Sequence, residues 1–166
     1  MTIAAKPDSD PGYAALREQN YCRIRLSLEA LYRITGPVQH RYLVVEPAAQ
    51  SGLYVQCLFA LDRSSMLCEA ASGRWLKPQR QLVSTARLPA LLALGFAPDP
   101  GDGNYHLERA IAGEPDLPAI AELYLRTLYD VFAVPPDAEL RLKAPLLRRL
   151  PYISRPLDRD CRPLIS

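Results

Sequence analysis

Three short segments with the composition of β-strands follow one another closely in the 166-residue chain. Residues 40–46, 53–60 and 66–71 are rich in β-branched, aromatic and aliphatic side chains. The connections between them, residues 47–52 and 61–65, carry turn-forming residues and are too short for the helical crossover that parallel strands require. This spacing therefore predicts an antiparallel β-meander.

A segment without glycine or proline precedes these strands, at residues 13–34. Its apolar positions keep the three-and-four spacing of a helical stripe, as at Tyr21, Ile24, Leu28 and Leu31. Gly36 and Pro37 supply an end to such a helix. Residues 22–30 also alternate between apolar and polar as a half-buried strand would. We favour the helix, because a typical strand has only about 5 to 6 residues.

The second half of the chain predicts two more helices and another strand. A short helix is expected around Leu91, with Gly95 as its end. A loop rich in proline and glycine then leads into a strand at residues 104–111. The clearest helix covers residues 117–132, with Asp116 as its N-cap. Together with the meander, these elements predict an α+β fold in which an antiparallel sheet packs against helices.

Charge is distributed unevenly along the chain, although the total is only +2. Residues 141–166 hold seven Lys or Arg and two Asp, a net charge of +5, so the other 140 residues carry the difference of −3. Prolines interrupt the basic part, which predicts an extended segment. We expect a flexible lead at residues 1–12, a folded domain at residues 13–140 and a basic, proline-rich arm at residues 141–166.

The sequence predicts a cytoplasmic protein without a membrane anchor. No apolar run approaches the roughly 18 to 20 residues that a membrane-spanning helix needs. Residues 1–15 lack the basic start and apolar core of a signal peptide. The composition, 49% hydrophobic and 23% charged, is typical of soluble globular proteins.

The four cysteines, at positions 22, 57, 68 and 161, show no CxxC spacing. Because no secretory signal is visible, buried reduced thiols are expected in place of disulfides. The two histidines, His40 and His106, are far from any cysteine pair in the sequence, so no zinc site is predicted.

Catalytic motifs are not apparent. The chain has no G-x-S-x-G elbow, and Gly101-Asp102-Gly103 is a turn, since it precedes an expected strand where nucleotide-binding loops precede a helix. We therefore predict a protein that is not an enzyme and uses no cofactor or metal. An enzyme using His40 or His106 stays as a third hypothesis, and it requires a cleft that brings one histidine within about 3 Å of a cysteine, serine or carboxylate.

Several short strings in this order of elements are similar to the TY-Chap domain family, which is related to type III secretion chaperones and YbjN-like proteins. The matching positions are Tyr54-Val55-Gln56, Glu69, Leu94-Gly95-Phe96, Asn104-Tyr105, Thr127-Leu128 and Val131-Phe132. The resemblance covers roughly residues 14–140. Phe96 stands where the family usually has tryptophan, and the basic arm has no counterpart in the family pattern.

The resemblance implies helices packed on one curved antiparallel sheet, a common dimeric state, and binding of protein segments without catalysis. We accordingly predict a chaperone-like, protein-binding module that holds a segment of a partner or client, as a homodimer or part of a hetero-complex. An antiparallel sheet with a free edge also offers unpaired backbone groups to an extended peptide.

Candidate partner-binding residues lie in the strands and in the arm. The predicted set is Leu43, Val45, Tyr54, Arg148, Arg149, Tyr152 and Arg155. The apolar members also fit an intramolecular core. The alternative function is a nucleic-acid-associated regulator that uses the basic arm, although the charge density of the arm disfavours nucleic acid as a partner.

Overall fold

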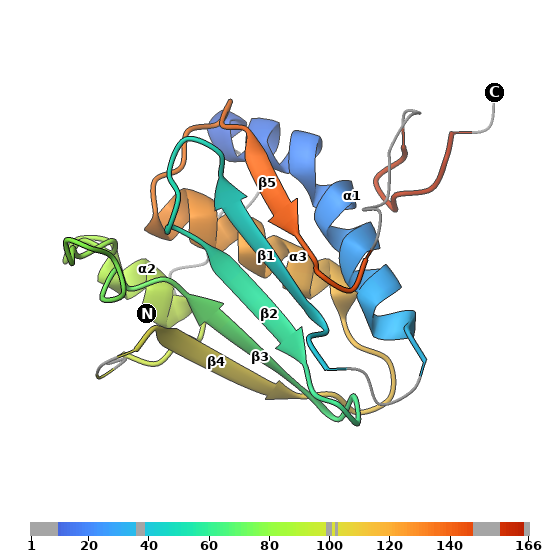
Figure 1. Cartoon of the computed structure of the whole chain (residues 1–166). Helices are drawn as coiled ribbons and strands as arrows, with labels where there is room; N and C mark the ends of the chain where they lie inside the picture. Colours follow the sequence, from blue (N-terminus) through green and yellow to red (C-terminus); the bar gives the residue numbers. More distant parts are fainter. Residues whose placement is uncertain (1–9, 36–38, 99–100, 102, 148–156, 165–166) are drawn as a thin grey trace, which may run out of the picture.

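The computed structural model of the chain describes residues 10–35, 39–98, 101, 103–147 and 157–164. Its centre is one antiparallel sheet of five strands, and the two longer helices pack on the same face of that sheet (Figure 1). The predicted α+β class is therefore confirmed. None of the helices in this described part has the length and apolar character needed to span a bilayer.

Helix α1 (Pro11–Arg33) confirms the helical interpretation of this segment over the strand alternative. The carboxylate of Asp10 caps the first turn by accepting hydrogen bonds from the N–H groups of Gly12, at 2.8 Å, and Tyr13, at 3.3 Å. The apolar stripe of the helix, including Ile24 and Leu28, is fully buried. Burial of this stripe holds α1 in the core.

The predicted meander is confirmed as β1 (Tyr42–Pro47), β2 (Val55–Phe59) and β3 (Ser65–Ala70), which pair antiparallel in sequence order. The short helix α2 (Leu88–Ala93) follows, and β4 (Tyr105–Ala110) then pairs antiparallel with β3. These two elements confirm the helix expected around Leu91 and the strand expected at residues 104–111.

A fifth strand, β5 (Leu140–Lys143), was not expected from the sequence. It pairs antiparallel with β1, so that the sheet order is β4-β3-β2-β1-β5. Leu140 and Leu142 are buried while Arg141 and Lys143 are exposed. The strand was not predicted because the segment is short and lies where the basic part of the chain begins. Residues 141–143, which the sequence assigned to the basic arm, therefore belong to the sheet.

Helix α3 (Leu117–Arg126) continues into a π-helical turn, η1 (Thr127–Val131). Together they confirm the helix predicted at residues 117–132. Asp116 caps it by accepting a hydrogen bond from the Ala119 N–H at 3.1 Å. The hydroxyl of Tyr124 reaches into the sheet, where it donates to the Leu43 carbonyl at 2.6 Å and accepts from the Cys57 N–H at 2.8 Å. This fully buried hydroxyl joins α3 to the central strands.

All four cysteines are paired, so the prediction of reduced thiols is wrong. Cys57 lies directly opposite Cys68 in the antiparallel register, and their Cα atoms are 4.0 Å apart. Cys22 in α1 is joined to Cys161, which is 139 positions away in the sequence. Sequence spacing could not show either pair, because the fold brings the partners together.

The disulfide to α1 holds a small hairpin at residues 157–164. Leu157 and Pro163 of this hairpin form an antiparallel β-bridge, and the Asp158 N–H donates to the Arg162 carbonyl at 2.9 Å. The carboxylate of Asp158 accepts further hydrogen bonds from the N–H groups of Asp160 and Arg162. Residues 148–156 of the predicted arm, and the lead at residues 1–9, lie outside the described residues.

Candidate functional site

The face of the sheet opposite α1 and α3 carries a row of half-buried apolar side chains. In β1, Leu43 and Val45 lie beneath the helices, so Tyr42 and Val44 belong to the other face, which no helix of the described residues covers (Figure 1). The register places Tyr42 opposite Leu58 of β2, and Leu58 opposite Leu67 of β3. We name the open face by these residues and their polar neighbours: Tyr42, Val44, Gln56, Leu58, Leu67, Glu69, His106 and Glu108.

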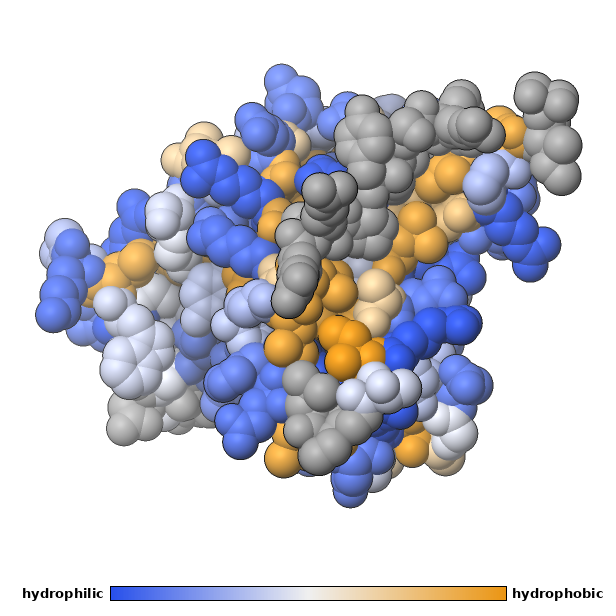
Figure 2. Space-filling view, turned by 45° about the vertical axis from the view of Figure 1, so that its right-hand side comes forward, coloured by the Kyte–Doolittle hydropathy of each residue, from blue (hydrophilic) through white to orange (hydrophobic). Residues whose placement is uncertain are grey.

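Polar groups border the apolar row on both sides. Toward β4, Glu69 and His106 lie opposite each other, and the Glu69 Oε1 to His106 Nε2 distance is 3.0 Å. Toward β5, the ammonium group of Lys143 is 2.6 Å from the carboxylate of Glu46. Figure 2, in which the molecule is turned by 45° from the view of Figure 1, shows hydrophobic side chains gathered at the surface among hydrophilic ones. A surface of this kind can bury apolar side chains of a ligand while its charged rim orients them.

A hydrogen-bonded group closes one end of the open face, where β2 and β4 begin and β3 ends. The side-chain amide of Asn104 donates to the Tyr54 hydroxyl at 2.8 Å, and its carbonyl oxygen accepts from the Ser72 N–H at 3.2 Å. Burial raises the pKa of the Tyr54 hydroxyl, so this group stays protonated to a higher pH than an exposed tyrosine. The three residues fix the start of the segment that follows β3.

The structure separates the residues that the sequence predicted for partner binding. Leu43 and Val45 are fully buried in the core, the second role that the sequence allowed for them. Tyr54 is half-buried at the end of the open face. The four predicted residues of the arm, Arg148, Arg149, Tyr152 and Arg155, lie outside the described residues. Their role in binding stays a prediction.

The two histidines lie in different surroundings. His40 is exposed and stacks edge-on against Tyr42, with ring centroids 6.2 Å apart. His106 meets the distance that an enzyme would require, since it lies 3.0 Å from Glu69, but its side chain is 48% exposed on the flat face of the sheet. Within the described residues, no group of three or more His, Cys, Asp or Glu side chains is placed to hold a metal ion.

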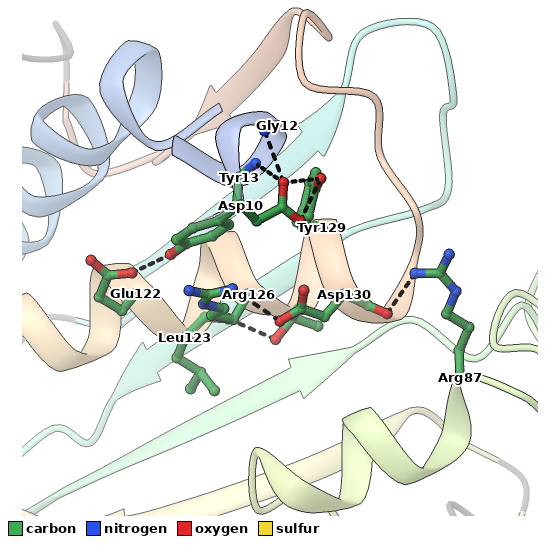
Figure 3. Close-up of polar contacts among 10 residues, drawn as sticks. Asp10, Gly12, Tyr13, Arg87, Glu122, Leu123, Arg126, Tyr129 and Asp130 are labelled. Atoms are coloured by element: carbon green, nitrogen blue, oxygen red, sulfur yellow. Dashed lines mark hydrogen bonds and ion pairs between the residues drawn. The ribbon is translucent and has the colours of Figure 1, made fainter. Parts of the chain in front are cut away.

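A cluster of polar and aromatic side chains lies between α1 and α3 (Figure 3). The Tyr13 hydroxyl donates a hydrogen bond to Glu122, whose carboxylate also accepts from Arg17 Nε at 2.5 Å. The guanidinium of Arg126 lies over the Tyr13 ring, 3.4 Å from its centroid. Nearby, the Tyr129 hydroxyl donates to the Asp10 carboxylate at 3.0 Å. Each member is paired with another, so this cluster fastens the two helices together.

The Tyr13 contact predicts a specific pH dependence of stability. Burial raises the pKa of the Tyr13 hydroxyl, and the neighbouring Glu122 carboxylate raises it further. Because the unfolded value is about 10, this hydroxyl stabilises the fold below about pH 10, and its contribution is lost as the pH rises toward the folded value. Urea unfolding between about pH 8 and 11 should show a shallower decline for Tyr13→Phe than for the wild type. Equal slopes would contradict this role.

The outward direction of the apolar residues of the open face could not be predicted from β1. Residues 42–45 of β1 are all apolar, so β1 itself gives no sign of which alternate side chains face outward. The signal was present in the neighbouring strands, where Gln56 and Glu69 mark the outward positions. The register then transfers the outward direction from Gln56 to Val44.

Comparison with known proteins gives one match. A family model described as TY-Chap3, "T3SS (YopN, CesT) and YbjN peptide-binding chaperone 3", matches residues 28–145. No curated protein matches the chain. No solved structure matches it either. The matched region begins within α1 and includes all five strands.

Proposed function

Because the chain belongs to the TY-Chap3 family of peptide-binding chaperones, we propose that it binds an extended segment of a partner protein and holds it without chemical change. Membership confirms the resemblance drawn from the sequence. The observation that carries the binding site is the open face: a one-sided sheet leaves Tyr42, Leu58 and Leu67 aligned across three strands and half-buried. The segment lies on this apolar row, which explains why these outward positions are not polar.

The rim of the open face gives the bound segment a direction. Glu69 and Glu108 lie on the β3 and β4 side, whereas Arg141 lies on the β5 side, next to the ion pair of Lys143 with Glu46. Charges of opposite sign on the two sides favour one orientation of a charged segment over the other. Apolar side chains of the segment supply most of the affinity, since exposed ion pairs contribute little.

Substitution of Leu58 tests this site. Peptides selected from a display library on the wild-type protein are synthesised with a fluorophore, and their Kd values are measured by anisotropy. We expect Leu58→Lys to raise Kd about tenfold or more, because it places a charge in the middle of the apolar row. Circular dichroism should show an unchanged fold, since the side chain points away from the core.

Leu61→Lys is the matched control, because Leu61 is 55% exposed in the connection between β2 and β3 and undergoes the same chemical change. Its Kd should equal the wild-type value. Equal losses for Leu58→Lys and Leu61→Lys would place the site elsewhere. If no peptide of the library binds the wild type, the proposed function itself is overturned.

Three further predictions belong to this proposal: absence of catalysis, a homodimer or hetero-complex, and a cytoplasmic location. The sheet has two edge strands, β4 and β5, and either can pair with a second copy or a partner. Light scattering of the purified protein measures the oligomeric state. Disulfides persist mainly in oxidising compartments, so thiol trapping in intact cells tests the location: disulfides that form only after cell lysis fit the cytoplasm, and disulfides already present in the intact cell do not.

A further inference from the structure

The only tryptophan of the chain, Trp75, stands on the surface with 70% of its area exposed. It belongs to residues 73–82, which follow β3 and which we call the Trp75 loop. Large aromatic side chains are normally covered in a folded protein, and tryptophan is the residue most enriched among the energetic centres of protein interfaces. An exposed tryptophan is therefore informative where its surroundings are fixed.

The Trp75 loop is closed at its base by backbone hydrogen bonds. The Gly73 carbonyl accepts from the N–H groups of Leu76, at 3.2 Å, and Arg80, at 3.3 Å, and the Leu82 N–H donates to the Ser72 carbonyl at 3.2 Å. Gly73 has a φ of +88°, and a Cβ atom at this position would lie 1.8 Å from the Arg80 carbonyl oxygen. These contacts hold the backbone of the Trp75 loop in place, so little backbone entropy is lost when a partner covers it.

The charged residues of the Trp75 loop are all positive. Arg74, Lys77 and Arg80 are exposed, and none of them makes an ion pair with a carboxylate of the described residues. The sequence contains no Asp or Glu at all between positions 71 and 98. An exposed aromatic side chain on a loop with three cations that have no carboxylate partner among the described residues is complementary to a ligand that carries both carboxylates and an apolar group.

The Trp75 loop adjoins the end of the open face. Its base begins at Ser72, which is hydrogen-bonded to Asn104, and Asn104 is bonded in turn to Tyr54. The side chain of Leu76 packs closely on Gly52 in the connection between β1 and β2. A segment that lies on the open face and continues past the start of β2 therefore meets the Trp75 loop next.

We propose that the Trp75 loop binds an acidic stretch, with one apolar or aromatic side chain against Trp75, in the same partner segment that occupies the open face. This assignment rests on the proposed function and adds a sequence preference to it. The carboxylates of the partner pair with Arg74, Lys77 and Arg80.

Other polyanionic or amphipathic partners fit less well. A nucleic acid that reached the loop along the sheet would meet the carboxylates of Glu69 and Glu108, which repel phosphates. A membrane surface needs several apolar anchors side by side. Trp75 is the only large hydrophobic side chain of its loop that the described structure exposes in this way.

Two labelled peptides of about 12 residues test the proposal. They share the same apolar half and lack tryptophan; the other half carries three glutamates in one peptide and three lysines in the other. At low salt the acidic peptide should bind about tenfold more tightly than the basic one, and the ratio should approach one at about 0.5 M salt. The acidic peptide should also shift the emission of Trp75 to shorter wavelength.

Variants separate the loop from the rest of the surface. Trp75→Ala should raise Kd for the acidic peptide about tenfold, and the double variant Arg74→Gln with Lys77→Gln about threefold to tenfold; neither should weaken the basic peptide. Arg159→Gln with Arg162→Gln, which removes the same charge from the C-terminal hairpin, is the control and should bind like the wild type. Leu58→Lys should weaken both peptides.

Each outcome decides between the two proposals. If neither peptide binds, the proposed function fails, and the preference falls with it. If both bind equally and Trp75→Ala has no effect, the function stands and the acidic preference is overturned. A loss in the Arg159 and Arg162 variant equal to that in the loop variant overturns it too. So does a Trp75 emission shift with anionic phospholipid vesicles or a single-stranded oligonucleotide where the acidic peptide gives none.

Discussion

Tyr124→Phe is expected to lower the free energy of unfolding by about 2–4 kcal/mol, although it removes a single oxygen atom. The hydroxyl bridges two backbone groups of adjacent strands, the Leu43 carbonyl and the Cys57 N–H. Phenylalanine fills the same space but leaves both groups buried without a partner, and the fully buried site admits no water to replace the oxygen. The loss is therefore larger than that of an ordinary hydrogen bond.

Urea unfolding of wild type and Tyr124→Phe, followed by far-UV circular dichroism, measures this difference. Tyr129→Phe is the matched control, because its hydroxyl bonds to Asp10 at the surface and water can take its place. We expect the control to unfold close to the wild-type midpoint. A Tyr124→Phe midpoint as high as that of the control would mean that the hydroxyl does not bridge β1 and β2.

The double variant Cys22→Ala with Cys161→Ala removes the disulfide between α1 and the C-terminal hairpin. We expect it to lower the free energy of unfolding strongly as well. The bond closes a loop of 139 positions, and a constraint of this length lowers the entropy of the unfolded chain by an amount worth about 4–5 kcal/mol at 25 °C. The corresponding value for the 11 positions between Cys57 and Cys68 is about 3 kcal/mol.

Hydrogen exchange distinguishes the two disulfides more sharply than stability does. In the Cys22 and Cys161 variant, exchange should rise at residues 157–164, because this bond is the covalent link between the hairpin and α1. The variant Cys57→Ala with Cys68→Ala should leave the hairpin protected, since its disulfide lies within the sheet. Unchanged protection of residues 157–164 in the first variant would show that non-covalent contacts hold the hairpin.

Most of the fold could be predicted because its elements have local signals. The helix at α1 has a periodic apolar stripe and a proline just beyond its end, and the meander has connections too short for any other arrangement. Strand β5 has no comparable signal: its four residues become a strand only because β1 offers them an edge. The pairing of the cysteines likewise depends on contacts distant in sequence.

The candidate site could be predicted only in part, because function depends on which face of the sheet stays uncovered. Leu43 and Tyr42 are adjacent and both apolar, yet the helices bury one and leave the other on the open face. Trp75 lies in a segment without regular structure, and its exposure follows from the way Gly73 closes the loop. No local pattern of residues reports either result.

The disulfide from α1 to the C-terminal hairpin also determines how the molecule responds to force. A pull on the two chain ends loads the covalent bond between Cys22 and Cys161 before it reaches any hydrogen bond of the sheet. The 139 positions enclosed by the bond, with all five strands among them, are shielded from that load. An unfoldase that threads the chain from its C-terminus would meet this covalent link near residue 161 and, unless the bond is reduced, would pull on α1 at Cys22 and on the C-terminal hairpin at the same time.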